Sequence, residues 1–330
     1  MPRFDTDTYV QGVLNGDRRM IAKTITLIES TLHRDEEQTQ DIIGQLLPHC
    51  GKSIRVGVTG PPGAGKSTFI EALGLHLLEN KRRVAVLAVD PSSKLSGGSV
   101  LGDKTRMGRL MANNDIFIRP SAAGETLGGV ARKTRETLLV LEAAGFDTVL
   151  VETVGVGQSE TVVADMTDFF LLVALPNAGD ELQGIKRGIM EMADAVVVNK
   201  ADGPFEDSAK QAAHVLRSAL QLMHHPRPDW DLPVLLISAR TGLGIDEVWK
   251  AILRFQGAMT ANGVLQARRR EQNLEWMTAL VREELSRQFD THSEVRYLLP
   301  ELRRKVSDGR MTAVRAASML MQAFSVGQTT

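Results

Sequence analysis

Residues 60–67 read Gly-Pro-Pro-Gly-Ala-Gly-Lys-Ser, and this stretch decides the fold. A β-branched run at 54–59 precedes it, and an apolar helical pattern begins directly after Thr68. A strand, a glycine-rich loop and a helix in this order are typical of a phosphate-binding loop, whose backbone N–H groups point at the phosphates. The alternative is a glycine-rich turn with an unrelated lysine, which would not need these flanks. We predict that a nucleoside triphosphate binds to Gly60, Pro61, Pro62, Gly63, Ala64, Gly65, Lys66, Ser67 and Thr68.

Two side chains of this loop have separate predicted roles. Lys66 is expected to reach the outer phosphates. Ser67 is expected to give its hydroxyl to Mg²⁺, a hard cation that takes oxygen ligands and is commonly shared between protein and phosphate.

Composition limits the class of protein. The 330 residues are 43% hydrophobic and 24% charged, with 39 Lys and Arg against 40 Asp and Glu. This is the composition of a soluble globular protein, and it lacks the basic excess of a nucleic-acid-binding one. Cys50 is the one cysteine, which excludes an intramolecular disulfide and favours an intracellular, cytoplasmic protein. No apolar stretch approaches membrane-spanning length, although a eukaryotic protein with its transit peptide removed would look the same.

The middle of the chain predicts an α/β fold. Short β-rich runs alternate with helical stretches, and the runs lie at 54–59, 83–89, 116–119, 148–152, 169–175, 195–199 and 233–237. Strands that alternate with helices indicate a mostly parallel central sheet with helices on both faces. We predict a P-loop NTPase domain over residues 51–256.

Both ends of the chain predict helices. Residues 1–50 have helical periodicity, with Ile21, Ile25, Ile28 and Leu32 on one stripe, and form a predicted N-terminal extension. Residues 257–330 form a predicted C-terminal arm, with apolar stripes at Leu274, Met277, Val281 and Leu285 and at Val295, Leu298, Leu302 and Val306. These stripes either fold back on the domain or pair with a second subunit, because both arrangements bury an apolar helix face.

The residues that follow a later strand predict which base the bound nucleotide carries. The run 195–198 leads into Asn199-Lys200-Ala201-Asp202, the Asn-Lys-x-Asp sequence of guanine-binding proteins. A carboxylate at Asp202 can accept from both the ring N1–H and the exocyclic amino group of guanine, and adenine offers no matching pair of donors. We expect Asn199 to brace this loop and Lys200 to lie along the ring, with Ser238-Ala239 presenting backbone to the guanine carbonyl.

Candidates for the catalytic and metal-binding groups follow other strands. Glu152 and Gly155 stand where most GTPases carry Asp-x-x-Gly, so Glu152 is expected near Mg²⁺ and the Gly155 N–H near the γ-phosphate. Asp90 ends the second strand, and Asp103 follows in a glycine-rich loop. The catalytic set is thus Lys66, Asp90, Asp103 and Glu152, and the metal set is Ser67, Asp90, Asp103 and Glu152.

With these motifs together, the sequence resembles the methylmalonyl-CoA mutase-associated GTPases of the MeaB/ArgK family, a SIMIBI-type division of P-loop GTPases with Glu in the third motif. The most specific segments are Glu152 to Glu160 and Pro176 to Lys186. The resemblance implies a Mg²⁺-dependent, GTP-hydrolysing chaperone of an adenosylcobalamin-dependent acyl-CoA mutase, such as methylmalonyl-CoA mutase. This chaperone would gate loading of the cofactor and protect or reactivate the mutase. The resemblance also implies a homodimer formed through the C-terminal helices, with the cobalamin adenosyltransferase as a further partner. Partner-facing switch residues would be Asn177, Asp180, Gln183 and Lys186.

Two other functions use the same phosphate loop. A small-molecule kinase or ATPase would not need the guanine motif at 199–202. A metal-delivery GTPase would carry Cys or His clusters near its switches, and this chain has 1 Cys and 7 His. Val156 stands where many small GTPases place glutamine, so we expect slow intrinsic hydrolysis that a partner accelerates.

Overall fold

The computed structural model describes residues 4–89, 108–111, 113, 115–119, 127–153, 159–176, 187–223, 227 and 230–326. The chain forms two compact units, Met1–Arg269 and Arg270–Thr330. The predicted division into residues 1–50, 51–256 and 257–330 stays a prediction.

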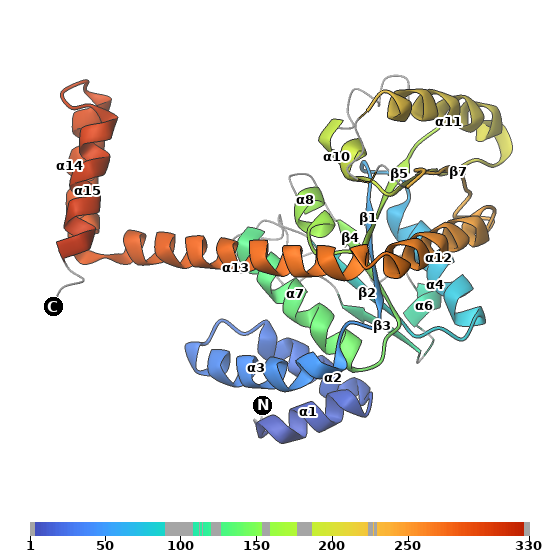
Figure 1. Ribbon diagram of the computed structural model, residues 1–330, viewed down its shortest axis with the longest axis horizontal. Helices are drawn as coiled ribbons and strands as arrows, with labels where there is room; N and C mark the ends of the chain where they lie inside the picture. The colour runs from blue at the N-terminus through green and yellow to red at the C-terminus, as the bar shows by residue number, and fades with distance from the viewer. Residues whose placement is uncertain are drawn as a thin grey trace. The chain divides into compact units, whose positions relative to one another are not determined.

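A seven-stranded sheet forms the centre of the first unit (Figure 1), and its strands adjoin in the order β3-β2-β4-β1-β5-β6-β7. The strands are β1 (Ile54–Thr59), β2 (Val84–Val89), β3 (Ile116–Arg119), β4 (Thr148–Thr153), β5 (Phe169–Ala174), β6 (Ala195–Val198) and β7 (Val234–Leu236). Every pairing between them is parallel. The predicted parallel α/β fold is therefore confirmed, and each strand lies where its apolar run predicts it.

Helices cover both faces of the sheet, because alternate residues of each strand point to opposite sides. Phe169, Leu171 and Val173 of β5 belong to the core beneath α4 and α12, whereas Leu172 and Ala174 pack against α10 and α11. The first face carries α4 (Lys66–Glu79), α6 (Gly108–Met111) and α12 (Ile245–Ala261). The second carries α7 (Leu127–Ala143), α8 (Ser159–Ala164), α10 (Arg187–Met192) and α11 (Glu206–Gln221), which follows the short helix η2 (Gly203–Phe205).

The N-terminal helices pack against α7. They are α1 (Thr6–Leu14), α2 (Arg18–Ile28) and α3 (His33–Leu46), followed by η1 (Leu47–His49). Ile21, Ile25 and Ile28 are buried on α2 as the periodicity predicts. Leu32 is not part of that stripe, since it caps the start of α3 and is 51% exposed.

Three of the strands, β4, β5 and β6, begin directly after an aspartate, at Asp147, Asp168 and Asp194. Each carboxylate accepts the backbone N–H of a residue at the start of an adjacent strand: Arg83 at 3.0 Å, Arg55 at 2.8 Å and Phe170 at 2.8 Å respectively. These bonds align the strands where they begin, at the amino-terminal edge of the sheet, which lies opposite the phosphate loop.

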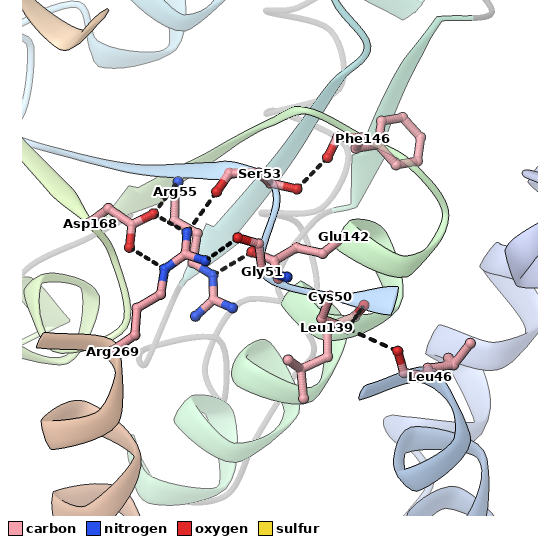
Figure 2. Close-up of polar contacts among 10 residues, drawn as sticks. All are labelled: Leu46, Cys50, Gly51, Ser53, Arg55, Leu139, Glu142, Phe146, Asp168 and Arg269. Carbon is pink, nitrogen blue, oxygen red and sulfur yellow. Dashed lines mark hydrogen bonds and ion pairs between the residues drawn. The ribbon is translucent and has the colours of Figure 1, made fainter. Parts of the chain in front are cut away.

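The first turns of α13 (Val264–Thr291) are attached to this edge (Figure 2). The Arg269 guanidinium bonds both oxygens of Asp168, and it also donates to the carbonyls of Gly51 at 2.9 Å and Ser53 at 2.6 Å. Beside it, Arg55 donates from Nε to the buried carboxylate of Glu142 at 2.7 Å. Buried charges at this edge are therefore paired, as the cost of desolvating them requires.

The second unit holds the rest of α13, together with α14 (Ser293–Ser307) and α15 (Ala313–Val326). Val295 and Leu302 of α14 are buried, and Phe289 and Phe324 pack edge to face at 5.5 Å. Along α13 the stripe of Leu274, Met277, Val281 and Leu285 is 51–62% exposed.

Candidate functional site

The phosphate loop connects β1 to α4, and its glycines hold conformations that side chains do not tolerate. Gly60, Gly63 and Gly65 all have positive φ. A Cβ on Gly60 would lie 2.2 Å from the Val173 carbonyl oxygen, and one on Gly65 would lie 2.5 Å from Nδ2 of Asn199. Only glycine allows this close approach, so the loop is held against β5 and the base motif.

Lys66, the first residue of α4, points back over the loop. Its ammonium donates to the carbonyl oxygens of Gly60 at 2.8 Å and Pro61 at 3.3 Å. Burial lowers the pKa of Lys66, and the carboxylates of Glu152 and Glu160 partly oppose this shift. A phosphate in the loop would give this half-buried ammonium an anionic partner.

Ser67 and Glu152 bring two oxygen donors together at the mouth of the loop. The Ser67 hydroxyl donates to Oε1 of Glu152 at 2.9 Å, and Glu152 is 3% exposed near the end of β4. A hydroxyl and a carboxylate are ligand types that suit Mg²⁺, which also retains water and phosphate oxygens. These residues therefore fit a magnesium ion. Within the part of the chain that the structure describes, no three His, Cys, Asp or Glu residues cluster as a metal site.

Asn199 connects three loops. Its Nδ2 donates to the Ala64 carbonyl at 2.8 Å, and its Oδ1 accepts the Ala239 N–H at 3.0 Å. The side chain is buried, at 2% exposed. One amide thus fixes the phosphate loop, the base motif and the Ser238-Ala239 turn relative to one another.

Asp202 is oriented by two neighbours. Hydrogen bonds from the Ser238 side chain and from Arg240 lower the pKa of Asp202, so its carboxylate is ionised and able to accept donors. Lys200, between Asn199 and Asp202, has φ of 60°, a left-handed conformation that is uncommon for a lysine. Arg240 is not among the predicted site residues, and the one signal for it is that it follows Ser238-Ala239.

Seven predicted site residues lie outside the described ranges. They are Asp90, Asp103 and Gly155, together with Asn177, Asp180, Gln183 and Lys186. Their roles in catalysis, metal binding and switching stay predictions. Among the described helices, none combines the length and the hydropathy needed to cross a membrane.

Comparison with known proteins agrees with this geometry. A family model described as "Methylmalonyl Co-A mutase-associated GTPase MeaB" matches residues 21–294. A Caulobacter vibrioides protein described as a GTPase is 50% identical over 326 residues, which cover 99% of this chain and 100% of that protein. The "Methylmalonic aciduria type A homolog, mitochondrial" of Mus musculus is 47% identical over 328 residues, covering 96% of this chain and 79% of that protein.

A solved structure also matches along nearly the whole chain. It is described as LAO/AO transport system kinase, is 36% identical, and has a TM-score of 0.79 with 96% of each chain covered. The long match at high identity and the parallel sheet with its phosphate loop identify the molecule as a GTPase of the P-loop class that binds guanine nucleotide. The chain belongs to the family of methylmalonyl-CoA mutase-associated GTPases described by the MeaB model.

Proposed function

We propose that this GTPase is a chaperone of an adenosylcobalamin-dependent acyl-CoA mutase, with methylmalonyl-CoA mutase as its client. The observation that carries the proposal is family membership over residues 21–294, in a family named for association with that mutase. The mouse relative, named for methylmalonic aciduria, supports the same client. In this proposal GTP hydrolysis controls loading of the cobalamin cofactor and protection of the loaded enzyme.

The triphosphate would lie along residues 60–67, with its β- and γ-phosphates against backbone N–H groups and the Lys66 ammonium. Ser67 and Glu152 would hold Mg²⁺, and Asp90 and Asp103 are proposed to complete the set. When bound, the ion would neutralise charge that develops on the phosphates during transfer to water.

Guanine would be recognised by the ionised carboxylate of Asp202. Adenine presents no N1–H, so binding it would leave this carboxylate without the two donors that guanine supplies, and a site built to bond such donors rejects an analogue that lacks them. The same loss disfavours an ATP-dependent small-molecule kinase, although the solved relative is described as a kinase.

Control of a client requires that GTP and GDP favour different arrangements of the protein. We propose that Gly155 reads the γ-phosphate and that Asn177, Asp180, Gln183 and Lys186 face the client. Intrinsic GTP hydrolysis would be slow, because Val156 has no side-chain amide to orient the attacking water. The client would accelerate this hydrolysis.

A homodimer through the C-terminal helices is also proposed. Leu274, Met277, Val281 and Leu285 repeat at helical spacing along α13, and each is more than half exposed. Burial of such a stripe against a second copy would remove apolar area from water.

The test combines the purified chain with methylmalonyl-CoA mutase and measures complex formation by size-exclusion chromatography with GTP, with GDP and with ATP. We expect a complex whose amount differs between GTP and GDP, together with faster GTP hydrolysis when mutase is present. A Lys66→Ala variant is the control, since it should lose both nucleotide effects. Absence of a complex in every nucleotide state would overturn the client, whereas ATP acting in place of GTP would overturn the guanine assignment.

A further inference from the structure

Two buried threonines join β1, which leads into the phosphate loop, to β4, which leads through Glu152 into the segment that contains Gly155. Thr59 is the last residue of β1, and Thr153 is the last residue of β4. The parallel register sets Val58 beside Glu152, so Thr59 and Thr153 are the next neighbours along the two strands. The Thr153 hydroxyl bonds Oγ1 of Thr59 at 3.0 Å and lies 3.5 Å from the Val58 carbonyl oxygen.

The end of β4 is therefore connected to the phosphate loop on both faces of the sheet. Successive strand residues point to opposite sides, so Glu152 faces α4 and bonds Ser67, while Thr153 faces away from α4 and bonds Thr59. Beyond Thr59 the chain enters the phosphate loop at Gly60. Beyond Thr153 it enters residues 154–158, which lie outside the described ranges and include Gly155.

Packing alone does not explain a hydroxyl at either position. Thr59 is 1% exposed and Thr153 is 3% exposed, and valines at Val58 and Val151 fill comparable positions in the same strands. Valine has the shape of threonine, and replacing both partners of a buried hydrogen bond by apolar groups of that shape is close to neutral for stability. What valine cannot supply is a directional bond between the two strand ends.

We propose that Thr153, acting through Thr59, is a positioning residue for GTP hydrolysis. The bond between the two hydroxyls sets the position of the end of β4 at Thr153 relative to Thr59, where the chain enters the phosphate loop. That distance matters because the γ-phosphate is held by the phosphate loop and read by the segment that follows Thr153. The proposal rests on the triphosphate site described above and does not depend on the client.

The test compares Thr153→Val, Thr153→Ser and the double variant Thr59→Val with Thr153→Val. We expect the double variant to melt within a few degrees of the parent and to bind GDP within about twofold of it. Its kcat for GTP should fall by about tenfold or more, because small misplacements of reacting groups cost up to about a hundredfold. Its affinity for a non-hydrolysable GTP analogue should fall relative to that for GDP. Thr153→Ser retains the hydroxyl and should keep the parent kcat.

Thr24→Val is the matched control. Thr24 is fully buried, and its hydroxyl bonds the Met20 carbonyl within α2 at 2.9 Å, so its loss should leave kcat unchanged. A double valine variant that hydrolyses GTP at the parent rate would overturn the proposal. So would a Thr153→Ser variant as slow as Thr153→Val, or a parallel loss of melting temperature and GDP binding in every threonine variant. Failure of the parent protein to bind nucleotide would instead overturn the proposed triphosphate site itself.

Discussion

Arg269 and Asp168 form a paired contact between the start of α13 and the start of β5. The Arg269 guanidinium donates from Nε to Oδ1 at 2.7 Å and from Nη2 to Oδ2 at 2.5 Å. Asp168 is 1% exposed and also accepts the Arg55 N–H. The pair is therefore a buried ionic contact whose geometry satisfies both oxygens.

Replacing Arg269 by alanine should destabilise the first unit. The Asp168 carboxylate would remain buried with one backbone donor, and breaking a buried pair in this way costs about 3–5 kcal/mol. Urea unfolding followed by circular dichroism measures the change. Arg270→Ala is the control, because Arg270 is exposed and its loss should change stability by no more than about 0.5 kcal/mol. Equal effects of the two substitutions would contradict the role given to the pair.

Asp202→Asn should abolish the preference for guanine. The amide presents one acceptor where the carboxylate presents two, so GDP affinity should fall by a factor of about 100 or more while ADP binding stays weak. Fluorescent GDP and ADP titrations measure both. Because the pKa of Asp202 is lowered, its ionised form persists well below neutral pH, and the selectivity for GDP over ADP should stay constant from pH 8 to about pH 5. Arg240→Ala should weaken GDP binding less than Asp202→Asn does, and the reverse order would contradict the assignment.

Ser67→Ala and Glu152→Gln should remove the magnesium dependence of nucleotide binding. Ser67→Ala removes the hydroxyl and Glu152→Gln removes the carboxylate charge from the pair that meets at 2.9 Å, and a hard cation binds more weakly when an oxygen ligand or its charge is lost. The measurement is GDP affinity with Mg²⁺ and with a chelator. In the parent, chelation should weaken binding by about tenfold or more, and in either variant the two values should converge. A Thr26→Ala control, at an exposed position on α2, should respond to chelation as the parent does.

Cys50 should be unreactive in the folded protein. Burial, with a smaller contribution from the Glu142 charge, raises the pKa of the Cys50 thiol to about 12, and the Sγ lies 3.3 Å and 3.2 Å from the Leu46 and Leu139 carbonyl oxygens (Figure 2). At pH 9 about a thousandth of the folded thiol is ionised, so alkylation should be at least about a hundredfold slower than in urea.

The same pKa shift predicts that the protein becomes less stable at high pH. The folded pKa lies above the unfolded one, so the contribution of the neutral thiol is complete below pH 9 and declines as pH rises toward 12. Since Cys50 is the one cysteine, mass spectrometry of a single adduct reports the reaction. Equal labelling rates in buffer and in urea would contradict the buried, protonated thiol.

The central strands could be predicted because they are buried on both faces. Phe169 to Ala174 is an unbroken apolar run for this reason, and the polar residues Asn199 and Glu152 mark where strands reach the nucleotide edge. The order of the strands could not be predicted, since nothing in the residues of β1 states that β4 and β5 are its neighbours.

The phosphate loop and base motif could be predicted because their chemistry requires fixed spacing along the chain. Arg269, Thr59 and Thr153 could not be predicted, because their partners lie 94 to 101 residues away and are brought close only by strand register and helix attachment. Leu32 matched the period of α2 but lies beyond the residue where that helix ends.

The three-loop contact of Asn199 has a consequence for synthesis of the protein. Ala64, whose carbonyl it holds, lies 135 residues earlier in the chain, and Ala239, whose N–H it accepts, lies 40 residues later. During translation the glycine-rich loop therefore leaves the ribosome long before the residues that hold it in place. A nascent chain that ends before Ala239 cannot form a complete nucleotide pocket, so nucleotide binding is expected only after most of the first unit has been made.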